Sequence, residues 1–68
     1  MLLFVLTYYD HYDHYHETIG VFTSEELALR TVAAERFRKF TKLHGSLWVK
    51  DGDNNCCLVL EEHFLVSE

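Results

Sequence analysis

The sequence predicts one α+β domain, residues 1–68, with a four-stranded, mostly antiparallel sheet and one helix on one face of it. Two observations predict this class. Short β-prone apolar runs lie on both sides of one segment with helical periodicity, which gives the element order β-β-α-β-β. The chain is short enough for one domain only, and it is 49% hydrophobic with no proline, which argues against disorder.

The first half of the chain predicts two paired strands. Residues 2–9 are apolar on both faces, as in a central strand, and residues 18–22 form a second short strand. Strands that are close in sequence usually pair, so we expect an antiparallel pair joined by the excursion 10–17.

A helix is predicted from about residue 24 to residue 43. Thr23 is the expected N-cap and Glu26 its capping-box partner, while Gly45 is the expected stop. Apolar residues at helical spacing predict the stripe that packs on the sheet: Leu29, Val32, Ala33, Phe37, Phe40 and Leu43.

The last part of the chain predicts a hairpin of residues 47–50 and 56–66 around the turn 51–55. Val59 and Leu65 lie on one face of the final strand by its alternation of period two. One helix covers only one face of a sheet, and a second apolar face is too large to leave in water. We therefore expect a homodimer or a protein partner on the uncovered face.

The segment 10–17 holds three histidines and three carboxylates, and all four tyrosines lie in residues 8–15. Three interpretations remain open: a solvated loop, a tyrosine-rich recognition surface, and a site for a divalent transition metal. The recognition residues would be Tyr8, Tyr12 and Tyr15. The metal ligands would be His11, His14, His16, Asp10 and Asp13, although their spacing matches no known zinc motif.

The sequence does not predict an enzyme or a resident cofactor. It has no phosphate-binding glycine loop and no nucleophile elbow. Cys56 and Cys57 are neighbours, so on a strand they point to opposite faces and do not form a disulfide with each other. His63 would lie about 20 Å from Cys57 along a strand, too far to activate the thiol.

The distribution of charge bears on a further alternative, which is contact with nucleic acid. Arg38, Lys39 and Lys42 lie on or near the outer face of the predicted helix, where they could contact nucleic acid. The formal charge of −5 opposes general nucleic-acid binding.

The apolar opening of the chain is too short to span a bilayer and has no basic flank, so we expect a cytoplasmic protein with no membrane partner.

Two segments carry a resemblance to a family. Phe4-Val5-Leu6 before an acidic and histidine-rich loop, followed by Ile19-Gly20-Val21-Phe22-Thr23-Ser24-Glu25-Glu26 and Ala28, resembles small uncharacterised bacterial and bacteriophage proteins. Those proteins share the layout V-L…I-G-V-[FY]-[ST]-S-x-E-x-A. The resemblance covers roughly the first half of the chain and implies a bacterial or phage cytosolic setting. It also implies an accessory or inhibitor role, in which the protein binds a larger host protein.

Overall fold

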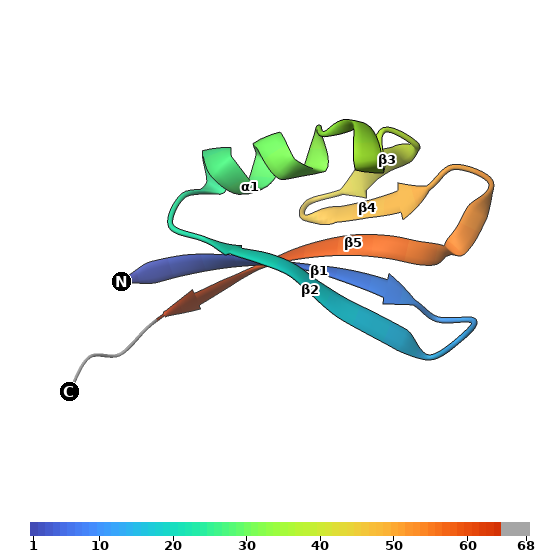
Figure 1. The fold of residues 1–68 in the computed structure, drawn as a ribbon, viewed down its shortest axis with the longest axis horizontal. Helices are drawn as coiled ribbons and strands as arrows, with labels where there is room; N and C mark the ends of the chain where they lie inside the picture. The colour runs from blue at the N-terminus through green and yellow to red at the C-terminus, as the bar shows by residue number, and fades with distance from the viewer. Residues whose placement is uncertain (65–68) are drawn as a thin grey trace.

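The computed structural model describes residues 1–64, apart from the side chains of Glu35 and Asn54. One α-helix lies against one face of a twisted sheet (Figure 1). The elements along the chain are β1 (Leu2–Asp10), β2 (Tyr15–Phe22), α1 (Glu25–Val32), the short 3-10 helix η1 (Glu35–Phe37), β3 (Phe40–His44), β4 (Leu47–Lys50) and β5 (Asp53–Phe64).

The sheet has five strands, not the predicted four, in the spatial order β2-β1-β5-β4-β3. All its neighbouring strands are antiparallel. The α+β class and the single α-helix on one face are confirmed, whereas the order β-β-α-β-β is wrong because a third strand follows the helix. β1 is an inner strand of the sheet, with β2 on one side and β5 on the other, as predicted for a central strand.

The core lies between α1 and the sheet. Leu6 and Leu58 are fully buried there, and Ala28 and Val32 are the buried residues of α1. The remaining members of this cluster are Phe4, Phe37, Trp48 and Leu60. We call this side of the sheet the helix face.

The helix is much shorter than the predicted span of residues 24–43. It begins one residue later than expected, because Ser24 and not Thr23 is the N-cap, and the Ser24 hydroxyl accepts a hydrogen bond from the Leu27 N–H at 3.2 Å. Near its end, the Thr31 hydroxyl donates to the carbonyl oxygen of Leu27, a bond that competes with helical geometry. The chain then leaves the helix at Ala33.

Residues 40–50 form a hairpin, where a helix end had been predicted. Gly45 has a φ of 52° and lies in the two-residue connection between β3 and β4, so it serves a hairpin and not a helix stop. The rings of Phe37 and Phe40 meet edge to face with centroids 5.8 Å apart, and both pack with the core. This packing and the pairing of β3 with β4 override the helical spacing of the apolar residues.

The connection between β1 and β2 is also tighter than predicted. Both strands extend into the expected excursion, which leaves only residues 11–14 as a turn. The Asp10 carboxylate accepts the N–H groups of Tyr12 and Asp13 at 3.0 and 3.3 Å, and His14 has a φ of 53°. Strand pairing therefore fixes half of the segment 10–17, and the hydrogen bonds to Asp10 hold part of the turn.

Candidate protein-contact surface

The face of the sheet opposite α1 carries an apolar surface with no covering layer within residues 1–64. Leu3 and Val5 of β1 and Val59 of β5 alternate with the buried residues of the helix face and are half-buried. Leu47 of β4 pairs with Val59 and is also half-buried. We call this side the open face. Its aliphatic surface continues into two residues on the outer strands, Val21, which is 58% exposed, and Leu43, which is 63% exposed.

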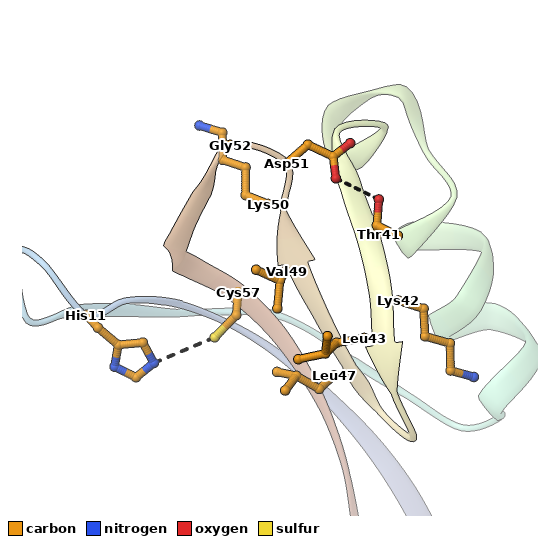
Figure 2. Close-up of a pocket in the computed structure, with 10 residues that line it drawn as sticks. All are labelled: His11, Thr41, Lys42, Leu43, Leu47, Val49, Lys50, Asp51, Gly52 and Cys57. Atoms are coloured by element: carbon orange, nitrogen blue, oxygen red, sulfur yellow. Dashed lines mark hydrogen bonds between the residues drawn. The ribbon is translucent and has the colours of Figure 1, made fainter.

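A groove of about 550 Å³ hollows the open face where β3, β4 and β5 meet the turn of residues 11–14. Leu43, Leu47 and Val49 form its apolar wall, and Cys57 and His11 close the other side (Figure 2). At its upper end in this view, the Thr41 hydroxyl donates to the Asp51 carboxylate at 2.7 Å. The groove is therefore mainly apolar, with polar groups at its edge.

His11 and Cys57 meet at the groove, with Nε2 and Sγ 3.7 Å apart (Figure 2). The backbone N–H of His11 donates a hydrogen bond to the backbone carbonyl oxygen of Asn55 at 2.9 Å, which holds the turn against β5. Burial, with a smaller effect of neighbouring Cys56, raises the pKa of the Cys57 thiol. A raised pKa keeps the sulfur protonated, so the pair lacks the activated thiolate of a nucleophilic site.

This pair was not predicted, because the sequence analysis compared Cys57 with His63 only. Both cysteines are free and buried, and they occupy opposite faces as expected. Tyr9 pairs with Cys57 in the β1–β5 register, and the turn after β1 returns His11 to the same place. Only the register shows this, and no spacing motif in the chain encodes it.

The three tyrosines predicted as contact residues have different surroundings. Tyr8 is partly buried and packs against the core on the helix face, and its hydroxyl donates to Cys56 Sγ at 3.3 Å. Tyr15 is 51% exposed and donates to the Glu17 carboxylate at 3.1 Å, a hydrogen bond that raises its pKa. Tyr12 is 79% exposed on the turn and is the most accessible of the three.

Tyr9, which was not singled out from the sequence, lies on the open face near the end of β1, between two histidine rings. Its ring is parallel to that of His11 within 6°, with centroids 6.1 Å apart, and a second imidazole, His16, lies at 6.0 Å. Val59 lies on the open face as predicted, and Leu65 lies outside the described residues.

The five residues proposed as metal ligands lie in or beside the turn of residues 11–14 and do not form one ligand cluster. Asp10 supports the turn, His14 lies within the turn, and His11 contacts Cys57. His16 is on β2 beside Tyr9, and Asp13 donates its N–H to Asp10. Among residues 1–64, no group of three or more histidine, cysteine, aspartate or glutamate side chains is arranged to hold a metal ion.

The basic residues proposed to contact nucleic acid are not on the α-helix. Arg38 and Lys39 lie between η1 and β3, and Lys42 is on β3, so the predicted basic helix face is wrong. Lys42 Nζ lies 5.9 Å from the centroid of the Trp48 ring, on the helix face of the β3–β4 hairpin. The positive charge is therefore placed at one edge of the sheet.

No protein-family model, curated protein or solved structure matches this chain. Within residues 1–64, no helix has the length and apolar character needed to cross a membrane.

Proposed function

We propose that this chain is a small protein-binding module that acts by contact through its open face. The observation that carries the proposal is the row of aliphatic residues on the uncovered side of β1 and β5. Leu3, Val5 and Val59 remain half-buried there with no second layer from residues 1–64 over them, while buried neighbours on the same strands, such as Leu6 and Leu58, face the core. A contiguous apolar surface of this kind is typical of interaction sites.

A second copy of the chain fits this surface as its first partner. Two open faces that meet about a two-fold axis each supply the same aliphatic row, so the contact is self-complementary. Polar groups lie beside the row: Glu61 and His63 are on the same face of β5, directly opposite Val5 and Leu3, with their side chains 3.3 Å apart. An apolar centre with a polar rim is the usual anatomy of a protein interface.

The bacterial or phage setting and the accessory or inhibitor role enter this proposal from the family resemblance. A dimeric core built through the open face leaves the edges of the sheet available for a larger partner. A catalytic role receives no support from the His11–Cys57 pair, because burial raises the pKa of the thiol.

Val59→Glu tests the proposal. A carboxylate in the centre of the row must be desolvated in the dimer but stays hydrated in the monomer, so we expect the substitution to abolish self-association. Light scattering across a dilution series should give twice the chain mass for the wild type and the chain mass for the variant. Circular dichroism should be unchanged, because Val59 is only half-buried.

Ala34→Glu is the matched control. It adds the same charge at an exposed position after α1, away from the open face, and should leave the dimer intact. Elemental analysis of the same scattering peak examines the metal alternative. A wild-type monomer with one metal ion per chain would overturn the contact proposal and favour the histidine-rich turn as the functional site.

A further inference from the structure

Strand β3 forms one edge of the sheet, and hollows lie on both of its faces. The groove on the open face is bordered by Thr41 and Leu43 of β3. A second hollow of about 580 Å³ lies on the helix face, where Phe40 of β3 borders it together with Trp48 and Phe37. Thr41 and Lys42 reach both hollows. Within the described chain, β4 is the only strand that pairs with β3.

A strand added beside β3 would use this arrangement directly. Its backbone would pair with the outer side of β3, and its successive side chains would enter the two hollows alternately, because neighbouring side chains on a strand point to opposite faces. This is the geometry of β-augmentation, in which main-chain hydrogen bonds give affinity and pockets for alternate side chains give specificity. Small apolar side chains suit the open-face groove, whose wall is aliphatic.

The charge around β3 selects the sign of its partner. Residues 36–51 contain five of the six lysines and arginines and one carboxylate, Asp51, which accepts a hydrogen bond from Thr41 of β3 at 2.7 Å. The local formal charge is therefore +4, against −9 for the remainder. A single lysine is enough to protect an edge strand from unwanted pairing, so this density exceeds that need. A positive edge on an acidic protein attracts an acidic partner segment.

We propose that the β3 edge binds an extended, acidic segment of a partner protein, which adds as a sixth strand. This inference rests on the proposed contact function and names the chemistry of the partner. Single-stranded nucleic acid is the competing occupant. The structure favours the peptide, because Trp48 and Phe37 are only 7% and 5% exposed, so neither of these two rings is open for bases to stack on.

A synthetic peptide serves as the probe: an acetylated Val-Thr-Val-Thr centre flanked by glutamates on both sides. Binding is followed by calorimetry and by amide chemical shifts in a titration of the intact protein. We expect the largest shifts at Thr41 and Leu43, and we expect affinity to fall as salt is raised. A peptide with lysine flanks and a peptide with a Val-Pro-Val-Pro centre should both fail, the first through charge and the second through lost strand pairing.

Charge reversal on the protein locates the site. Lys42→Glu and, separately, Lys39→Glu should each weaken the glutamate peptide by about five- to tenfold. Arg30→Glu changes the net charge equally on the exposed side of α1, where Arg30 pairs with Glu26, and should leave the affinity within about twofold of wild type. Two variants are needed because Lys42 also contacts the Trp48 ring.

Several results would overturn the inference: equal binding of the lysine-flanked or proline peptide, equal weakening by Arg30→Glu, or tighter binding of an oligothymidine than of the glutamate peptide. The Val59→Glu monomer separates this inference from the proposed function. It should bind the peptide at least as tightly as the wild type, because Val59 is absent from both hollows and no second copy covers the open-face groove in the monomer. Failure of the peptide with a dimer that still responds to Val59→Glu would remove the edge-strand site alone.

Discussion

The helix face and the open face of the sheet are built from adjacent residues of the same strands, yet their surroundings differ. On β5, Leu58 is fully buried in the core on the helix face, whereas its neighbour Val59 is half-buried on the open face. On β1, Tyr8 packs into the core, whereas Tyr9 is flanked by imidazoles at the end of the open face.

The difference shows that the chemistry of a side chain does not by itself decide whether that side chain stabilises the monomer or is available to contact a partner. Both faces are apolar in sequence, because each long strand is apolar at consecutive positions. The eight-residue helix α1 can shield only one of them. Apolar residues on the shielded face stabilise the monomer, and those on the other face are available to a partner.

The largest effect expected from this comparison is on the free energy of unfolding. Leu58→Ala removes a fully buried side chain and should lower it by about 2–5 kcal/mol, enough to unfold much of so small a domain. Val59→Ala should lower it by about 1 kcal/mol or less. Urea denaturation should be measured at dilutions where self-association does not contribute. Equal losses for the two variants under those conditions would show that the open face already stabilises the monomer.

A smaller effect is expected at the next pair of neighbours. Tyr8→Phe removes the hydrogen bond from the phenol to Cys56 Sγ and should lower the free energy of unfolding by about 0.5–1.5 kcal/mol. Tyr9→Phe keeps the ring between its two imidazoles and should change stability by less than about 0.5 kcal/mol. Thermal melts of both variants measure the difference. A reversed order would mean that the end of the open face, and not the core, depends on a tyrosine hydroxyl.

The strands were predictable where the sequence either alternates between apolar and polar residues or is apolar on both faces. Residues 2–9 and the final strand carry strong β signals over many residues, and the faces of the final strand follow from its period of two. The uncovered apolar face followed from the same patterns, because one helix cannot cover two faces.

The segment from Ala33 to His44 was mispredicted because its apolar residues also fit a helical wheel. Helical periodicity and strand alternation are hard to separate over so few residues. The deciding signal was Gly45-Ser46 between two β-prone runs, a two-residue hairpin connection that had been interpreted as a helix stop. The His11–Cys57 contact and the two hollows beside β3 depend on register between distant strands, which local patterns do not encode.

The smallest effect expected from the comparison appears only at alkaline pH. The hydrogen bond to Cys56, together with burial, raises the pKa of Tyr8 from 10.0 to about 12. The folded state therefore holds the phenolic proton more tightly than the unfolded state does. The resulting stabilisation is complete below about pH 10 and is lost as the pH rises from 10 to about 12. Phenolate absorbance in a pH titration should show one late component near pH 12, and Tyr8→Phe should remove it. If the late component survives in Tyr8→Phe but disappears in Tyr9→Phe, the open face would hold the perturbed tyrosine and the contrast between the two faces would fail.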